Sequence, residues 1–222
     1  MLMSNSLSGE LPKSLFNSSS LIEIFLQQNS FVGSIPDVTA KSSPIKYLSL
    51  RNNNISGTIP SSLGNFSSLL TLNLAENNLE GDIPESLGHI QTLERLILYV
   101  NNLSGLVPLS IFNLSSLTFL SMGNNSLMGR LPNDIGYTLP KIQGLILSTN
   151  MFVGQIQASL LNAYHLEMLY LGNNSFTGIV PFFGSLPNLE QLDVSYNKLE
   201  PDDWGFMTSL SNCSKLTQLM LD

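Results

Sequence analysis

The chain has 222 residues, of which 43% are hydrophobic and 11% are charged, and its formal net charge is −7. This apolar content is enough for a continuous core and argues against a disordered chain. The acidic balance, with nine Lys and Arg that form no cluster, argues against a nucleic-acid partner.

Asparagine returns along the whole chain at a nearly constant spacing, with steps of 24, 24, 24, 24, 24, 25, 24 and 23 residues. A fixed period of this length is the signature of a leucine-rich-repeat solenoid, in which each unit contacts only its neighbours. We therefore expect a single array of about nine repeats over residues 1–222 and no second domain. The periodic residues are Asn5, Asn29, Asn53, Asn77, Asn101, Asn125, Asn150, Asn174 and Asn197.

Each unit contains a segment of the form Leu-x-x-Leu-x-Leu, whose alternation predicts a short strand with one buried face. Stacked side by side at about 4.8 Å, these strands form a concave parallel sheet roughly 40 Å long. The expected fold is a right-handed α/β repeat solenoid that is mostly strand and coil. The segments begin at Leu21, Ile45, Leu69, Leu93, Leu117, Ile142, Leu166, Leu189 and Leu216.

The asparagine after each strand is expected to be buried where the chain turns. Its amide supplies donors and an acceptor to backbone groups that the turn leaves unpaired, which is a structural role. Further along each unit comes glycine, then an apolar residue and usually proline, as in Gly81-Asp82-Ile83-Pro84. The stretch that follows, for instance 62–69, is too short for a long helix and predicts a 3₁₀ or single-turn helix on the convex side.

We expect no catalytic site, no metal and no cofactor. The single cysteine, Cys213, excludes an internal disulfide framework and is expected to be buried. His89 and His165 lie about three repeats apart, so they cannot share a metal ion or a nucleophile. The acidic run at Glu200, Asp202 and Asp203 lacks the ligand spacing of a calcium loop.

No apolar run is long enough to cross a membrane, and the first residues lack the regions of a signal peptide. Eight Asn-x-Ser/Thr sequons nevertheless match the acceptor pattern for glycosylation in a secretory compartment. Composition is the alternative explanation, because a repeat rich in Asn and Ser generates such triplets by itself. The sequons are at Asn17, Asn54, Asn65, Asn102, Asn113, Asn124, Asn173 and Asn212.

The phrase Asn77-Asn78-Leu79-Glu80-Gly81-Asp82-Ile83-Pro84 resembles the plant-specific class of leucine-rich repeats, and the match extends over essentially the whole chain. The resemblance implies the ectodomain of a plant receptor-like kinase or receptor-like protein, with a second short strand around the Gly-x-Ile-Pro segment. It also implies a peptide or protein ligand on the sheet and a co-receptor kinase as a further partner. The parent protein would then lie at the extracellular face of the plasma membrane, and this segment itself would not touch the membrane.

After Asn197 the pattern changes, since Pro201 stands where glycine is expected and residues 202–213 replace the usual turn. This departure resembles the long repeat of receptor kinases related to the bacterial-elicitor sensors, which favours a role in immune perception. The family's cysteine-paired caps, signal peptide, transmembrane helix and kinase have no counterpart in the sequence. We therefore expect a fragment that is truncated at both ends.

Variable strand positions point out from the concave sheet, where apolar entries gather on four successive strands. Such a cluster is suited to anchor a partner, and arginines beside it are suited to meet a ligand carboxylate. The alternative is that these are ordinary exposed aromatics packed along the sheet. The candidate ligand-binding residues are Tyr47, Arg51, Arg95, Ile97, Tyr99, Phe119, Ile146, Met168 and Tyr170.

The leading hypothesis is a ligand-binding fragment of a plant cell-surface receptor. One alternative is a secreted inhibitor resembling the polygalacturonase-inhibiting repeat proteins, which would block an enzyme through the same concave face. The other is a non-functional or decoy gene fragment.

Overall fold

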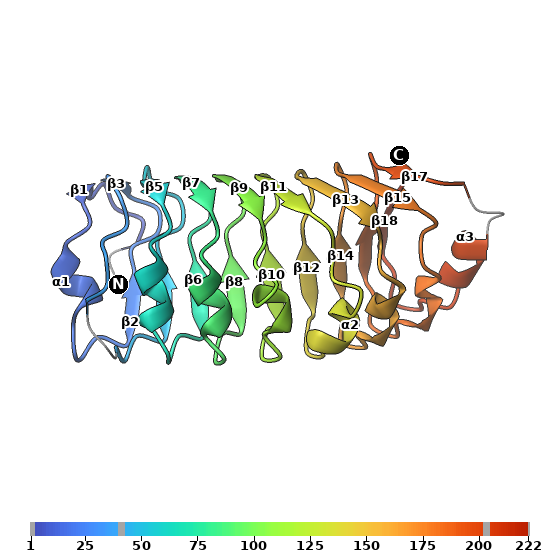
Figure 1. Ribbon diagram of the computed structural model, residues 1–222, viewed down its shortest axis with the longest axis horizontal. Helices are drawn as coiled ribbons and strands as arrows, with labels where there is room; N and C mark the ends of the chain where they lie inside the picture. Colours follow the sequence, from blue (N-terminus) through green and yellow to red (C-terminus); the bar gives the residue numbers. More distant parts are fainter. Residues whose placement is uncertain (1–2, 40–42, 202–204, 222) are drawn as a thin grey trace.

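The computed structural model describes residues 3–39, 43–201 and 205–221, whose strands stack into an elongated solenoid (Figure 1). Nine parallel strands form the first sheet in chain order, so that every repeat lies beside the next one. This architecture confirms the predicted fold class. The strands are β2 (Glu23–Phe25), β4 (Tyr47–Ser49), β6 (Thr71–Asn73), β8 (Arg95–Ile97), β10 (Phe119–Ser121), β12 (Gly144–Ile146), β14 (Met168–Tyr170), β16 (Gln191–Asp193) and β18 (Gln218–Met220).

A second parallel sheet runs along one edge of the solenoid, at the top of Figure 1. It lies where the resemblance implies a second short strand, because β7 contains Gly81 of the Gly-x-Ile-Pro segment. A separate two-stranded ladder, β1 (Ser8–Glu10) with β3 (Ser30–Val32), precedes it. The seven strands of the second sheet are β5 (Ser56–Thr58), β7 (Asn78–Asp82), β9 (Asn102–Leu106), β11 (Ser126–Gly129), β13 (Met151–Gln155), β15 (Ser175–Gly178) and β17 (Lys198–Leu199).

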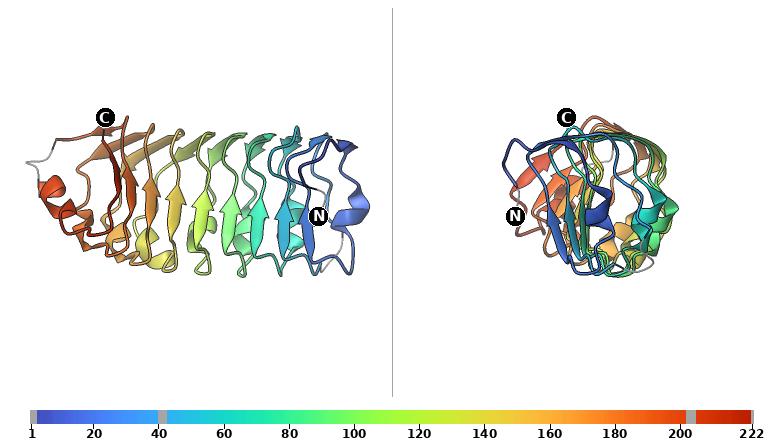
Figure 2. Two further views of the ribbon diagram at one scale, coloured as in Figure 1. Left: turned by 180° about the vertical axis from the view of Figure 1, so that it is seen from behind. Right: turned by 90° about the vertical axis from the view of Figure 1, so that its left-hand side faces the viewer.

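Short helices cover the face opposite the nine-stranded sheet, as the two sides of the molecule show (Figures 1 and 2). All are brief, as predicted for the convex side. The 3₁₀ helices are η1 (Ser61–Asn65), η2 (Glu85–His89), η3 (Ile111–Asn113), η4 (Ala158–Asn162) and η5 (Phe183–Ser185). The α-helices are α1 (Lys13–Phe16), α2 (Ile135–Thr138) and α3 (Gly205–Leu210).

Differences in repeat length are absorbed on the helical side. The repeat between Asn125 and Asn150 has one residue more than the usual 24, and its convex segment forms α2 where most neighbours form a 3₁₀ helix. On the concave side Leu120 still lies directly opposite Leu145, so the sheet register continues unbroken. The substitutions after Asn197 fall partly on residues 202–204, which lie outside the described residues.

The core consists of columns of identical positions from successive repeats. Leu72, Leu96 and Leu120 lie side by side in register, and all three are fully buried. A second column lies toward the other sheet, where the rings of Phe152 and Phe176 stack with centroids 6.2 Å apart. Because each repeat buries its apolar face only against the repeats beside it, stability is set by these nearest-neighbour interfaces.

Each interface is also crossed by an asparagine amide. Asn101 Nδ2 donates to the carbonyl of Leu98 in its own repeat and to that of Leu74 in the preceding repeat, both at 3.0 Å. Its Oδ1 accepts from the N–H of Leu79 in the preceding repeat, at 3.0 Å. The same arrangement recurs at Asn53, Asn77, Asn125, Asn150, Asn174 and Asn197.

The asparagines differ in burial more than expected. Asn29, Asn53 and Asn77 are buried, whereas the later ones are half-buried. The expectation of burial is wrong for Asn5, which is exposed because no described repeat packs on its outer side. The amide is therefore held by its hydrogen bonds even where water reaches part of the side chain.

The nine periodic asparagines form a ladder along the solenoid, and the residue before each of them has a left-handed backbone, with φ between 48° and 57°. Asparagine tolerates this region, and it occupies the position at 52, 124 and 173. Val100 occupies it in the fifth unit with φ of 55°, although a β-branched side chain is strained there. The turn geometry of the repeat therefore overrides the preference of this residue.

We expect Asn101→Leu to lower the free energy of unfolding by about 1 to 3 kcal/mol, because two carbonyls and one N–H lose their partner. Urea unfolding followed by circular dichroism measures the change. Asn102→Ala is the control, since its exposed side chain lies next to the ladder without belonging to it. Equal effects of the two substitutions would contradict the structural role of the ladder.

We expect Val100→Asn to raise the free energy of unfolding by about 1 kcal/mol, because it relieves left-handed strain. Asn124→Val makes the reverse exchange at the equivalent turn and should destabilise the protein by a similar amount. Thermal and urea unfolding of both variants provide the measurement. A destabilising Val100→Asn would show that its side-chain packing outweighs the backbone strain.

Candidate functional site

The nine-stranded sheet displays its variable side chains in rows that cross the strands. One row places in register, on β8, β10, β12 and β14, the residues Arg95, Phe119, Gly144 and Met168. The adjacent row places on the same strands the residues Ile97, Ser121, Ile146 and Tyr170. Six of the candidate residues thus share one surface, which we call the central cluster: Arg95, Ile97, Phe119, Ile146, Met168 and Tyr170.

A glycine shapes the middle of the central cluster. A Cβ atom on Gly144 would lie 2.5 Å from both Cδ2 and Cε2 of Phe119, and 3.4 Å from the terminal methyl of Met168. The ring of Phe119 therefore lies over the space that the missing side chain leaves. On the other side, the Arg95 guanidinium lies 4.5 Å from the Phe119 ring centroid, which is a cation–π contact.

Tyr170 closes the cluster on the C-terminal side. Its hydroxyl donates to Gln191 Oε1 and lies 3.4 Å from Gln218 Oε1. Burial, and then the negative charge of Asp193, raises the pKa of the Tyr170 phenol. The ring thus adds apolar surface to the cluster while its neutral hydroxyl is held by the next two strands.

Asp193 follows Tyr170 in the same row and was not among the predicted site residues. A Cβ atom on Gly172 would lie 2.5 Å from each Asp193 carboxylate oxygen, so the carboxylate lies over this glycine. Asp193 Oδ1 also accepts from Ser195 N at 3.0 Å and from Ser195 Oγ at 2.5 Å. The sequence signal that could have indicated Asp193 is Gly172, because a glycine at a row position leaves space that a side chain from the neighbouring strand can occupy.

Arg51 and Tyr99 belong to a separate polar cluster and not to the apolar surface. Arg51 Nη2 donates to Glu76 Oε1 at 2.6 Å, and the Tyr99 hydroxyl donates to the same oxygen. Asn52 Nδ2 donates to Glu76 Oε2 at 2.8 Å. The carboxylate expected for Arg51 is therefore supplied by this chain, from the neighbouring repeat.

The ionisation of this polar cluster follows from its contacts. Burial raises the pKa of Glu76, but the hydrogen bonds from Tyr99, Arg51 and Asn52 outweigh it, so the net pKa is lowered. The bond to Glu76, helped by burial, raises the pKa of Tyr99. At pH values between the pKa of Glu76 and the pKa of Tyr99, the charged carboxylate and the neutral hydroxyl therefore stabilise each other.

Tyr47 is also apart from the central cluster. It lies on β4, two strands from β8 at the N-terminal end of the cluster, and its ring faces that of Phe25 with centroids 6.5 Å apart. The strands therefore separate the nine candidates into the central cluster, the Arg51–Tyr99 pair and Tyr47.

The remaining predicted features lie outside this surface. His89 and His165 are exposed, and Cys213 is buried with its thiol 3.3 Å from the carbonyl of Phe183. Seven sequon asparagines are exposed, whereas Asn17 is half-buried and its Oδ1 accepts from Thr39. Within the described residues no group of three or more His, Cys, Asp or Glu is placed to hold a metal ion, and no helix is long and apolar enough to span a membrane.

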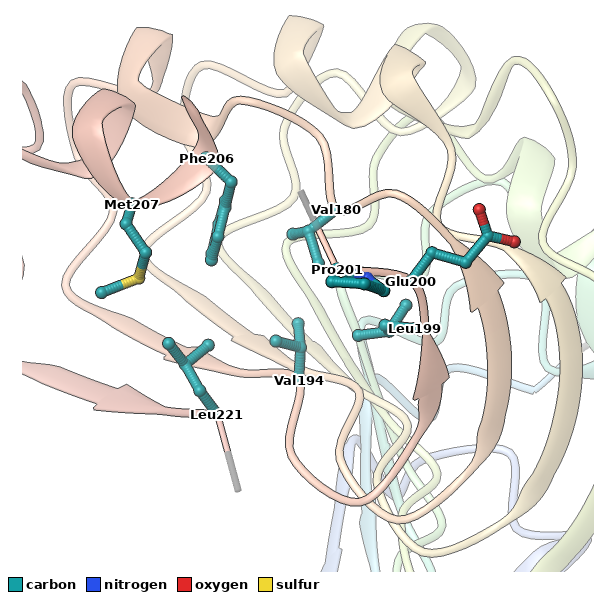
Figure 3. A pocket seen from close by; sticks show the side chains of 8 residues that line it. All are labelled: Val180, Val194, Leu199, Glu200, Pro201, Phe206, Met207 and Leu221. Carbon is teal, nitrogen blue, oxygen red and sulfur yellow. The ribbon is translucent and has the colours of Figure 1, made fainter. Parts of the chain in front are cut away.

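A hollow of about 330 Å³ lies at the C-terminal end of the described solenoid (Figure 3). Phe206 and Met207 from α3, together with Leu221, face Val194 across it. Val194 and Leu221 occupy the leucine columns of their repeats, so the hollow continues the apolar core. It offers no set of convergent polar groups that would orient a small ligand.

We expect the stability difference between the native chain and Glu76→Gln to depend on pH. Because the folded-state pKa of Glu76 is lowered, its contribution is present above the ordinary value of 4.5 and is lost as the pH falls through the folded-state pKa. Urea unfolding at several pH values from acid to neutral measures this difference. A difference that stays constant over this range would contradict the assignment. Glu80→Gln, at an exposed position on β7, is the control.

Comparison with known proteins agrees with this geometry. The family "Leucine Rich Repeat" matches residues 44–66, 68–90 and 116–137, and "Leucine Rich repeats (2 copies)" matches residues 165–204. No curated protein shows significant sequence similarity to the chain.

Several solved structures are similar over nearly the whole chain. The Arabidopsis receptor kinase HAESA, in complex with the peptide hormone IDA and the co-receptor SERK1, is 33% identical over 98% of this chain and 40% of its own, with a TM-score of 0.76. PEPR1, in the complex PEPR1-AtPEP1, is 31% identical over 99% of this chain and 34% of its own, with a TM-score of 0.79. The ectodomain of GASSHO1/SCHENGEN3 from Arabidopsis thaliana, in complex with CASPARIAN STRIP INTEGRITY FACTOR 2, is 30% identical over 98% of this chain and 28% of its own, with a TM-score of 0.80.

The chain therefore spans between about a quarter and two fifths of the length of these ectodomains. A plant ice-binding protein, 22% identical with a TM-score of 0.72, shares the fold alone. The repeats, the two parallel sheets and these matches lead to one conclusion: the chain belongs to the leucine-rich-repeat proteins, and its solenoid is a segment of the plant receptor-kinase ectodomain type.

Proposed function

We propose that the chain is a ligand-binding segment of a plant cell-surface receptor, and that a peptide or protein ligand binds on the nine-stranded sheet. The observation that carries this proposal is the central cluster, because five apolar or aromatic side chains gather in register on four adjacent strands. All five are partly accessible to solvent, so the cluster is available to a partner. Apolar and aromatic side chains grouped in this way are typical anchors of an interface.

The similar structures support a peptide as the ligand class. The structures of HAESA, PEPR1 and GASSHO1/SCHENGEN3 are each described as complexes, and that of HAESA names a peptide hormone. The HAESA complex also contains a co-receptor, which supports a co-receptor ectodomain as a second partner of the parent protein. The proposal assigns binding and not catalysis to this segment.

The proposal places the segment outside the cell and in immune perception. Exposure of seven sequon asparagines supports glycosylation in a secretory compartment, because each of these amides is accessible. The long last repeat supports the resemblance to elicitor sensors, since α3 (Gly205–Leu210) is the longest convex helix in the described chain. The immune role rests on this resemblance.

Removal of a side chain from the central cluster should weaken ligand binding. We expect Phe119→Ala and Met168→Ala each to weaken peptides selected on the native chain by about thirtyfold, because each removes an anchor of the apolar surface. The peptides come from a random library displayed on phage, and their affinities are measured by surface plasmon resonance.

Tyr137→Ala is the matched control, because Tyr137 is an exposed aromatic residue on convex helix α2. Its removal should leave the affinities unchanged. Selected peptides that bind all three variants as tightly as the native chain would show that the ligand does not use the central cluster.

A further inference from the structure

The central cluster is bounded by opposite charges. Arg95 lies at its N-terminal end against Phe119, and Asp193 lies beyond Tyr170 at its C-terminal end. In the described part of the chain neither residue takes part in a salt bridge, since the ion pair there joins Arg51 to Glu76. Both charges are therefore available to a molecule that lies on the cluster.

The two ends also differ in their wider surroundings. Glu167 and Glu190 occupy equivalent positions just before β14 and β16, and the N–H of Glu190 donates to the carbonyl of Glu167 at 2.8 Å. Two further acidic residues thus precede the strands on which Tyr170 and Asp193 lie. The basic residues Arg130 and Lys198 lie away from the cluster, because Arg130 follows β11 and Lys198 is in β17, both of which are strands of the second sheet. Lys215 Nζ donates to Asn188 Oδ1.

Charged residues other than Arg95 and Asp193 also flank the strands of the cluster. Lys141 precedes β12 by three residues, at the turn that leads into the strand. At the N-terminal end, Glu94 is next to Arg95 in sequence but forms no salt bridge with it in the described structure. Along the two rows, the surface therefore runs from the stacked cation of Arg95 to the carboxylate of Asp193.

The distance between the two ends selects the class of ligand. Arg95 on β8 and Asp193 on β16 are separated by four strand intervals of about 4.8 Å each. They also lie in adjacent rows, so the distance between the two residues is about 20 Å. An extended chain advances about 3.3 Å per residue, so it covers this distance in about six residues. A small molecule is too short to reach both charges.

Two glycines give the Phe119 ring and the Asp193 carboxylate room to lie against the sheet. Gly144 carries no side chain in the row of Phe119, and Gly172 carries none beside Asp193. The Phe119 ring and the Asp193 carboxylate each lie over one of these glycines and are held there. Phe119, stacked against Arg95, and Asp193, bonded to Ser195, are thus held in place before a ligand arrives, which lowers the entropic cost of binding.

We propose that the ligand is a peptide lying extended across the strands, with an acidic group at Arg95, an apolar or aromatic side chain between Phe119 and Met168, and a basic residue at Asp193. The acidic and basic groups are about six residues apart. This inference rests on the proposed function, because it specifies the ligand of the same surface. Opposite charges at the two ends orient the peptide relative to the solenoid.

The test selects random peptides of about twelve residues on the native 222-residue chain and on charge variants. On the native chain we expect enrichment of peptides that carry an acidic and a basic residue with about five residues between them, one of which is apolar. Asp193→Asn should weaken these peptides about tenfold and remove the preference for the basic residue. Arg95→Gln should remove the preference for the acidic residue.

Matched controls are Glu80→Gln and Arg130→Gln, which remove the same charges from exposed positions associated with the second sheet. Both should leave the selected sequences and their affinities unchanged, and thermal unfolding verifies that every variant is folded. Peptides that depend on Phe119 but not on Arg95 or Asp193 would overturn the inference and leave the proposed function intact. Absence of any peptide that depends on Phe119 would instead contradict the proposed function.

Discussion

The amide of one asparagine per repeat is the contact on which the rest of the structure depends. Asn77, for example, donates to carbonyls of its own repeat and of the preceding one, and accepts from the N–H of Ile55. A side chain that must satisfy groups in two repeats at once fixes how far each unit can rotate or slide against the next. The leucine columns then supply apolar burial at a spacing that this hydrogen bonding has already set.

Much of this architecture is predictable from sequence because its causes are local and repeated. Nine copies of one pattern place the strands, the turns and the brief helices within a residue or two. Burial of individual asparagines was less predictable, since Asn5, Asn53 and Asn150 hold the same position in the pattern but are exposed, buried and half-buried. Val100 is a related case, because the turn imposes a left-handed backbone on a residue whose own preference is against it.

The candidate site was predictable as a surface but not as a set of contacts. Reading the rows brought Phe119, Met168 and Tyr170 together, because strand periodicity determines which side chains share a face. It did not reveal that Glu76 neutralises Arg51, since Glu76 sits at a turn position outside the rows. Nor did it select Asp193, which lies in the row of Tyr170 and whose carboxylate occupies the space beside Gly172.

Helix α2 shows where the repeat tolerates a change in length, because the extra residue is taken up there while Leu120 and Leu145 stay aligned. Insertions and deletions on the helical side therefore leave the rows of the concave face in step. Substitutions within the rows, by contrast, change the outer surface and leave the spacing of the units intact. In evolution, a solenoid of this kind can change its concave surface and its backbone length as two independent traits.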